Sequence, residues 1–334
     1  MKIGSYNFNM SLILDEIKKH GYKTVLLQAP EGVKKYVFQV VDEIETKTKA
    51  KVMISTDPCY GACDIPVHAA KQLGVDLVVQ LGHLPIPNLK LPLPVLFMNI
   101  VADAREEESV KKAIEKLEGT KIGVVTTAQH IEKLPQMVSV LKKNGFIPVV
   151  GKGDNRIARD GQVLGCNMST AQSISDKVDC FLFVGTGRFH PLGIALATSK
   201  PVVSANPFTL EVLKSEINEE KKKLMKKRYG AIAAAYNAKT FGIVVSVKPG
   251  QMRMKTARVL EKKLENAGKK VYILIADDIN PSLAKTFDVD CLVSTACPRV
   301  VLDEAERFEI PLLTPTEVDI LLEETNKYKL DTLQ

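Results

Sequence analysis

The sequence contains no tryptophan, only 6% aromatic residues and no apolar run near the ~20 residues that a membrane-spanning helix needs. Its beginning, MKIGSYNFNM, lacks the charged start and apolar stretch of a signal peptide, so the cytoplasm is the expected location. Nucleophile elbows, HExxH, P-loops and paired-carboxylate motifs are also absent. These absences argue against ordinary hydrolases and kinases.

Charge of either sign is not in large excess. A net charge of +7 over 334 residues permits an acidic partner but does not point to nucleic acid. The densest basic stretch, 221–228, follows two glutamates and has no interleaved aromatic residues. This pattern favours a solvated helix face over an RNA-binding surface.

A weak threefold repeat organises the chain. A buried strand is expected directly after Val75-Asp76, Val178-Asp179 and Val289-Asp290, which lie about a third of the chain apart. Each of these strands is followed by another that opens with proline. An earlier strand in each third, as in 24–32 or 121–130, runs into a polar or Gly/Pro loop and then a helix-like segment.

Strands that alternate with helices in this way predict an α/β fold of parallel sheets with right-handed crossovers. We expect three pseudo-repeated Rossmann-like domains over residues 1–117, 118–230 and 231–334. The helix near 110–117 is expected to close the first domain, and the lysine-rich helix near 211–228 the second. No low-complexity linker separates them, so they should pack around a common centre.

Ligands of such sheets collect beyond the carboxyl ends of the strands, so loops that follow strands are the candidate sites. Cys63, Cys166 and Cys297 each lie in one of these loops, one in each third of the chain. Three thiolates suit an iron–sulfur cluster with one iron left open, or zinc. The spacing is equally compatible with three unrelated cysteines.

The other three cysteines give weaker signals. In a long cytosolic chain all six should be reduced. Cys180 and Cys291 directly follow the aspartate of an apolar strand and are expected to fill the core. Cys59 forms a Cys-x-x-x-Cys pair with Cys63, which by itself is weak evidence for a metal.

Further candidates lie in the loops 126–130 and 185–193. The glycine-rich GTGRFHPLG has backbone amides that can cradle a carboxylate or phosphate, although a plain tight turn explains it equally well. His130 and His190 can act in proton transfer or ligation, or can simply hydrogen-bond their loops. Arg299 can pair with a substrate carboxylate or form an ordinary salt bridge.

Six motifs carry a resemblance to a known family. The ordered set, which spans nearly the whole chain, resembles the archaeal diphthamide-synthesis enzymes, the 2-(3-amino-3-carboxypropyl)histidine synthases, which use an atypical radical-SAM chemistry. The motifs are YGACD (60–64), TTAQH (126–130), GQVLGCN (161–167), FHPLG (189–193), VSVKPGQ (245–251) and ACPRV (296–300).

The resemblance implies a triangle of three related α/β domains around a central 4Fe–4S cluster. The positions that match the family's ligands are Cys63, Cys166 and Cys297. S-adenosyl-L-methionine is then the substrate, cleaved reductively at the sulfur–Cγ bond. The 3-amino-3-carboxypropyl group is transferred as a radical to a histidine of translation elongation factor 2, the first step of diphthamide biosynthesis.

The resemblance also implies partners, and the loops that follow strands supply candidate substrate contacts. A homodimer with an electron donor is expected, with no membrane and no direct nucleic-acid partner. Beyond the cluster ligands no catalytic residue is predicted. The candidate substrate-binding residues are Gln129, His130, Gly185, Thr186, Gly187, His190, Gln251 and Arg299.

Two alternative functions remain open at this point. Quinolinate synthase is also built from three pseudo-repeated domains around a three-cysteine cluster, and it uses the open iron as a Lewis acid. A cluster-free nucleotide-binding module that uses the loop 185–193 belongs to a different class. Iron content and the products formed from S-adenosylmethionine distinguish these alternatives.

Overall fold

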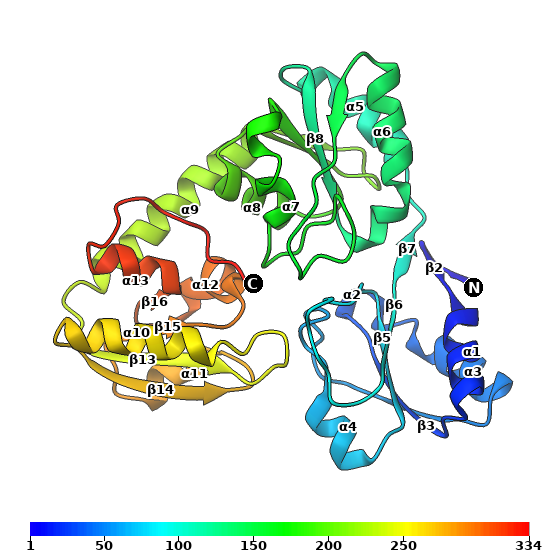
Figure 1. The fold of residues 1–334 in the computed structure, drawn as a ribbon, viewed down its shortest axis with the longest axis horizontal. Helices are drawn as coiled ribbons and strands as arrows, with labels where there is room; N and C mark the ends of the chain where they lie inside the picture. Colours follow the sequence, from blue (N-terminus) through cyan, green and yellow to red (C-terminus); the bar gives the residue numbers. More distant parts are fainter. Residues whose placement is uncertain (334) are drawn as a thin grey trace.

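The structure of the protein, a computed structural model, describes residues 1–333. Three α/β lobes lie at the corners of a triangle, and we call them the first, second and third lobes in chain order (Figure 1). The first is blue to cyan, the second green and the third yellow to red. Among the described residues, no helix is both long and apolar enough to cross a membrane.

The first lobe contains a four-stranded parallel sheet in the order β4-β3-β5-β6. A small antiparallel sheet, β1-β2-β7, lies beside it. The strands are β1 (Lys2–Ile3), β2 (Tyr6–Phe8), β3 (Thr24–Gln28), β4 (Lys51–Ile54), β5 (Leu77–Leu81), β6 (Val95–Met98) and β7 (Ile100–Ala102). The helices are α1 (Met10–His20), α2 (Glu31–Lys34), α3 (Val37–Lys47) and α4 (Val67–Leu73).

The second lobe has the sheet order β9-β8-β10-β11-β12, parallel except for the last strand. The strands are β8 (Lys121–Thr126), β9 (Ile147–Val149), β10 (Cys180–Val184), β11 (Val202–Ala205) and β12 (Val212–Leu213). The helices are α5 (Glu106–Ala113), η1 (Ile114–Lys116), η2 (Ala128–Lys133), α6 (Leu134–Lys143), α7 (Ser169–Gln172), η3 (Ser175–Lys177), α8 (Phe189–Thr198) and α9 (Ser215–Ala234).

The third lobe has the parallel order β14-β13-β15-β16. The strands are β13 (Thr240–Ser246), β14 (Lys270–Ala276), β15 (Cys291–Ser294) and β16 (Leu312–Leu313). The helices are α10 (Met254–Asn266), α11 (Ser282–Thr286), α12 (Pro298–Glu304), η4 (Ala305–Arg307) and α13 (Pro315–Leu321).

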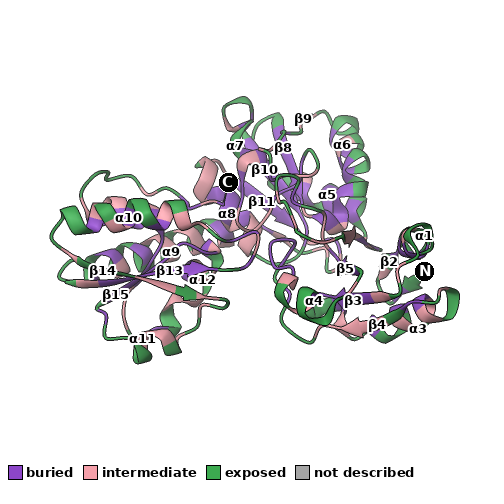
Figure 2. Ribbon diagram, turned by 60° about the horizontal axis from the view of Figure 1, so that its bottom comes forward, coloured by how far each residue is buried: buried purple, intermediate pink, exposed green. Residues whose placement is uncertain are grey.

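All three sheets share one topology. The first parallel strand of each lobe lies between the second and the third, and the fourth follows on the outside. The central strands are buried on both faces, and the covering helices keep an exposed outer side (Figure 2). This repeated, doubly wound arrangement confirms the α/β fold class predicted from the sequence.

The structure places the helix near 110–117 in a different lobe from the one predicted from the sequence. Val110 and Ala113 of α5 share a core with Ile122 and Val124, so α5 closes the second lobe and not the first. The prediction for this helix was wrong because its apolar spacing does not specify which sheet it covers. The three domain ranges themselves stay predictions.

The long helix α9 belongs to two lobes. Ile217 near its start lies in the core of the second lobe, and Ile232 near its end lies in that of the third. Its lysines are largely exposed, as the charge pattern indicates, but Arg228 is buried. Two guanidinium nitrogens of Arg228 each donate to a carboxylate oxygen of Glu317 at 2.7 Å, which joins α9 to α13.

Three equivalent aspartates stabilise the three sheets in the same way. One carboxylate oxygen of Asp76 accepts hydrogen bonds from the backbone N–H groups of Lys23 and Thr24 at 2.7 and 2.9 Å, at the start of β3. Asp179 and Asp290 accept the corresponding pairs of N–H groups at the starts of β8 and β13. These backbone hydrogen bonds lower the pKa of all three carboxyl groups below the usual range.

We expect these aspartates to make the fold sensitive to acid. A carboxyl group whose pKa is lower in the folded state stabilises the fold fully above its unfolded pKa of about 4 and loses that contribution as the pH falls through the folded value. The triple variant Asp76→Asn, Asp179→Asn, Asp290→Asn should therefore show a lower Tm at pH 7 and a smaller fall in Tm between pH 5 and 2.5. Calorimetry measures both, and Asp42→Asn, at an exposed position of α3, is the control. An unchanged acid dependence in the triple variant would contradict this role.

Candidate metal centre

A loop of the third lobe is joined to a loop of the first by hydrogen bonds and an ion pair. The backbone N–H of Gly250 donates to the carbonyl of Cys63 at 2.9 Å, and the Gln251 amide nitrogen lies 3.4 Å from the Cys63 sulfur. Lys248 reaches Asp64 at 2.8 Å. The segment 246–251 after β13 is thus fixed to the segment around Cys63 by backbone and side-chain contacts alike. We call 246–251 the junction loop.

Gly250 sits against Cys63 with no space for a side chain. A Cβ atom at this position would lie 2.5 Å from both Cα and Cβ of Cys63. Non-bonded carbon atoms do not approach this closely, so only glycine allows the two backbones to meet here. The glycine of the sequence Lys-Pro-Gly-Gln is therefore required for the junction loop to approach Cys63 this closely.

Gln251 links two of the predicted site cysteines. It is 5% exposed, and its own backbone N–H closes a turn onto the Lys248 carbonyl at 2.9 Å. Its amide oxygen accepts the backbone N–H of Cys297 at 3.3 Å, while its amide nitrogen faces the Cys63 sulfur. One side chain thus spans the distance between the first-lobe and third-lobe cysteines.

The segment that carries Cys166 and Arg156 is held from two directions. The chain end crosses from the third lobe to the second, where the N–H of Leu333 donates to the Cys166 carbonyl at 3.0 Å (Figure 1, red segment). Asn167 donates to the Leu333 carbonyl at 2.9 Å. From the other side, buried Arg156 donates to the carbonyl of Gly250 at 3.0 Å. The second lobe is thereby tied to the same junction loop.

The three thiols influence one another. Burial raises the pKa of Cys63 to about 12, with the neighbouring Cys166 adding to the rise. Burial also raises the pKa of Cys297 and of Cys166, and at Cys297 the other two thiols contribute. Thiols in this arrangement ionise together only when a cationic centre compensates their charge. The donor set fits a metal cluster in that respect.

The three cysteines do not occupy equivalent positions of the repeat. Cys63 follows β4 and Cys166 follows β9, the second strands of their lobes, whereas Cys297 follows β15, a third strand. Among residues 1–333, no three His, Cys, Asp or Glu side chains are placed to hold one metal ion. A four-iron cluster has no such requirement, because each thiolate binds a different iron.

Lys248 is a buried cation with two carboxylate partners. Its ammonium group lies 2.8 Å from Asp64 and 3.0 Å from Asp278. Burial alone lowers the pKa of Lys248, but the hydrogen bonds to both carboxylates outweigh it and the net shift is upward. Lys248 is therefore charged, and the carboxylates of Asp64 and Asp278 neutralise its charge.

Two other predicted site residues lie beside the cysteine loops. The guanidinium of Arg299 stacks on Phe189, 4.1 Å from the ring centre, and donates to Asp303 at 3.0 Å. Gly165, next to Cys166, packs against the side chains of Arg299 and Phe189. His190 follows Phe189, and burial together with the charge of Arg299 lowers the pKa of His190 to about 4. This imidazole is neutral near pH 7.

The remaining candidates are placed differently. The Gln129 amide donates to the Gly82 carbonyl at 2.9 Å, which fixes the second lobe to the first. His130 is buried and its Nδ1 lies 2.8 Å from Glu106. Gly185, Thr186 and Gly187 form the turn that leads into α8. These contacts join elements of the fold, and a role in substrate binding stays a prediction for all five.

Sequence reasoning missed Arg156, Lys248 and His83. Their loops follow strands, but nothing in the sequence shows that these charged or titratable groups are buried. His83 lies near Cys63, since a Cβ on Gly61 would lie 3.6 Å from the Cys63 sulfur and 4.0 Å from His83 Nε2. Burial lowers the pKa of His83 to about 4, so this ring is also neutral near pH 7.

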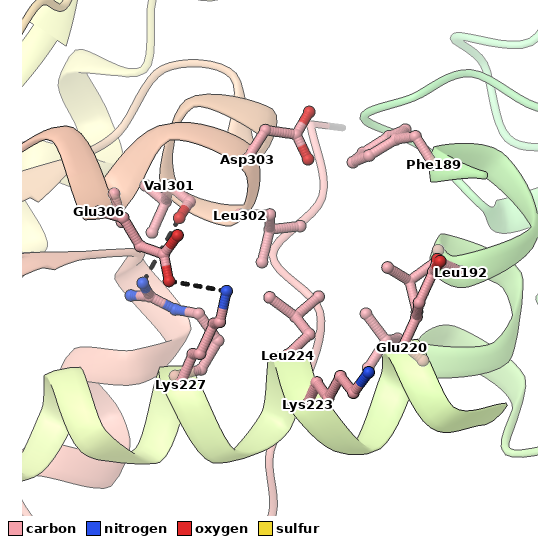
Figure 3. Close-up of a pocket in the computed structure, with 14 residues that line it drawn as sticks. Phe189, Leu192, Glu220, Lys223, Leu224, Lys227, Val301, Leu302, Asp303 and Glu306 are labelled. Carbon is pink, nitrogen blue, oxygen red and sulfur yellow. Dashed lines mark hydrogen bonds and ion pairs between the residues drawn. The ribbon is translucent and has the colours of Figure 1, made fainter. Parts of the chain in front are cut away.

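A cavity of about 260 Å³ is lined by Phe189 and lies between α8, α9 and α12 (Figure 3). Its walls include Leu192, Leu224 and Leu302, and its rim carries Lys227, which pairs with Glu306 at 2.7 Å. The second and third lobes both contribute to it. The cavity thus lies next to the ring that supports Arg299.

Comparison with known proteins identifies the family. The family model described as "Putative diphthamide synthesis protein" matches residues 29–332. The chain belongs to this diphthamide-synthesis family. The resemblance inferred from the motifs is therefore confirmed.

Named relatives cover almost the whole chain. The 2-(3-amino-3-carboxypropyl)histidine synthase of Pyrococcus horikoshii is 38% identical over 97% of this chain and 92% of its own length. The enzyme of the same name from Methanocaldococcus jannaschii is 32% identical over 96% and 90%. Subunit 1 of the mouse synthase is 31% identical over 96% of this chain and 73% of its own.

A solved structure shares the fold. The crystal structure of Dph2 from Pyrococcus horikoshii with a 4Fe–4S cluster superposes with a TM-score of 0.91 at 36% identity, covering 98% of this chain and 94% of that one. The similarity extends over all three lobes. The family, the named relatives and this structure favour the diphthamide-synthesis family over quinolinate synthase and over a cluster-free nucleotide-binding module.

We expect Gly250→Ala to destabilise the junction. The added methyl would overlap the Cys63 backbone, and overpacking of this kind costs about 1–3 kcal/mol of unfolding free energy. Urea denaturation of the metal-free protein measures the change. Gly230→Ala on α9, where no atom lies within 4 Å of the new Cβ, should be neutral or stabilising. Equal stabilities of the two variants would contradict the close approach.

Proposed function

We propose that the protein is a 2-(3-amino-3-carboxypropyl)histidine synthase that carries out the first step of diphthamide biosynthesis. It transfers the 3-amino-3-carboxypropyl group of S-adenosylmethionine to a histidine of translation elongation factor 2 and releases 5′-methylthioadenosine. The observation that carries this proposal is the meeting of three cysteine loops, one from each lobe, at the junction loop.

Cys63, Cys166 and Cys297 are the residues proposed to hold a 4Fe–4S cluster. Their thiols lie close enough to raise one another's pKa, and they come from a chain that is similar over its full length to a protein crystallised with such a cluster. A cluster held by three thiolates supplies an open iron position and a low-potential electron for the sulfonium of S-adenosylmethionine.

The protein's own contribution to the reaction is to position the substrate. Which carbon–sulfur bond of the sulfonium breaks depends on which carbon is held toward the site. The Arg299–Phe189 pair and neutral His190 flank the cysteine loops and are suited to orient the substrate, with Arg299 able to exchange Asp303 for a substrate carboxylate. Gln251, another candidate for substrate binding, uses its amide group for hydrogen bonds to Cys63 and Cys297 and is proposed to position these cysteines.

A single chain carries all three cysteines, which supports a self-sufficient homodimer as the working form. Elongation factor 2 as acceptor and a one-electron donor complete the partners. An acceptor of protein size requires a site open to a large surface, and the net charge of +7 is compatible with an acidic partner.

We expect Cys63→Ala, Cys166→Ala and Cys297→Ala each to lose bound iron and the transfer to elongation factor 2. After anaerobic reconstitution, iron analysis and mass spectrometry of the acceptor measure the two losses. Cys180→Ala, in a fully buried core position of β10, is the control and should keep both. Full iron and full transfer in all three site variants would overturn the ligand assignment.

A further inference from the structure

We propose that Gln251 and Arg156 are positioning residues that favour the reduced form of the cluster. Gln251 acts through an N–H···S hydrogen bond to Cys63, and Arg156 through a buried positive charge. This inference rests on the proposed function. It concerns one step, in which the cluster gains one electron from a one-electron reductant and its charge becomes more negative by one.

Gln251 touches two of the proposed ligands and is held at its backbone and at its amide group. Its backbone is fixed by the turn onto Lys248, and its amide oxygen is held by the Cys297 N–H at 3.3 Å. The amide nitrogen is thereby directed at the Cys63 sulfur, 3.4 Å away. A donor to a ligand sulfur stabilises the more negatively charged, reduced cluster and so raises its potential.

Arg156 is a buried guanidinium without a carboxylate partner among residues 1–333. It is 6% exposed, one of its terminal nitrogens donates to the Gly250 carbonyl at 3.0 Å, and its Nε has no hydrogen-bond acceptor in the described chain. A buried charge of this kind is costly unless an anion compensates it. Thiolates around an iron–sulfur centre supply that negative charge.

The other cations near the site are already neutralised. Lys248 pairs with Asp64 and Asp278, and Arg299 pairs with Asp303. Arg156, by contrast, has no carboxylate partner in the described chain, and it donates to the carbonyl of Gly250, the residue that packs against Cys63. The guanidinium therefore lies where the segment that carries Cys166 meets the loop of Cys63.

The experiment is an anaerobic redox titration of the reconstituted, full-length protein, followed by electron paramagnetic resonance of the reduced cluster. Gln251→Leu and Arg156→Gln should each shift the midpoint potential to a more negative value with iron content retained. Arg156→Lys keeps the charge and should restore most of the potential. The controls are Arg159→Gln, at an exposed arginine paired with Glu132, and Gln136→Leu, at an exposed position of α6.

The outcomes separate this inference from the function on which it rests. A wild-type protein that takes up no iron overturns the proposed function and the inference together. If the wild-type protein binds its cluster but both variants have the same midpoint potential as the wild type, the inference alone is overturned. A folded variant that keeps no iron assigns that residue a purely structural role and overturns the inference for it.

A substitute is available if Gln251→Leu does not fold. Gln251→Glu keeps the shape and the oxygen that accepts the Cys297 N–H, but replaces the donor to sulfur with an anionic oxygen. Its potential should also move to a more negative value. An unchanged potential in Gln251→Glu would contradict the role of the amide donor.

Discussion

The close approach of Gly250 to the backbone of Cys63 is the contact on which the arrangement of the site depends. It brings a loop of the third lobe within hydrogen-bond distance of the first, and the carbonyl of the same glycine accepts a hydrogen bond from Arg156 of the second. One residue thus contacts all three lobes. Because interiors are closely packed, this contact constrains how the cysteine loops of the three lobes can lie relative to one another.

The chain end adds a second constraint of the same kind. The segment after α13 leaves the third lobe, places Leu330 in the core of the second and ends on the Cys166 carbonyl. Arg253, just after the junction loop, binds Asp331 at 2.6 Å and also donates to the carbonyls of Thr295 and Ala296, before Cys297. The same arginine therefore connects two of the cysteine loops through the tail.

The charge balance of the site follows from which cations are paired. Lys248 is surrounded by carboxylates, which leaves its field weak beyond the triad. Arg156 has no such partner in the described chain, and it donates to Gly250, which packs against Cys63. A site of three thiolates with one unpaired guanidinium is suited to hold an electron-rich centre whose charge changes by one.

The fold was predictable from the sequence because it repeats. Three apolar strands after Val-Asp, each with an earlier strand and helix, are sufficient to predict three parallel α/β units, and the aspartates have a shared physical role as acceptors at strand starts. The family's motifs predict which three cysteines hold the cluster, and that assignment stays a prediction. Arg156 and the bridging role of Gln251 could not be predicted, because burial and contacts between lobes depend on tertiary packing that local sequence does not encode. The lobe to which α5 belongs was missed for the same reason.

The central claim is that this site cleaves S-adenosylmethionine at the sulfur–Cγ bond. The most direct test is chromatography of the products after the anaerobically reconstituted protein is mixed with S-adenosylmethionine and dithionite. The account expects 5′-methylthioadenosine that forms only when the reductant is present. Formation of 5′-deoxyadenosine instead, or no cleavage by a protein that carries its full complement of iron, would contradict it.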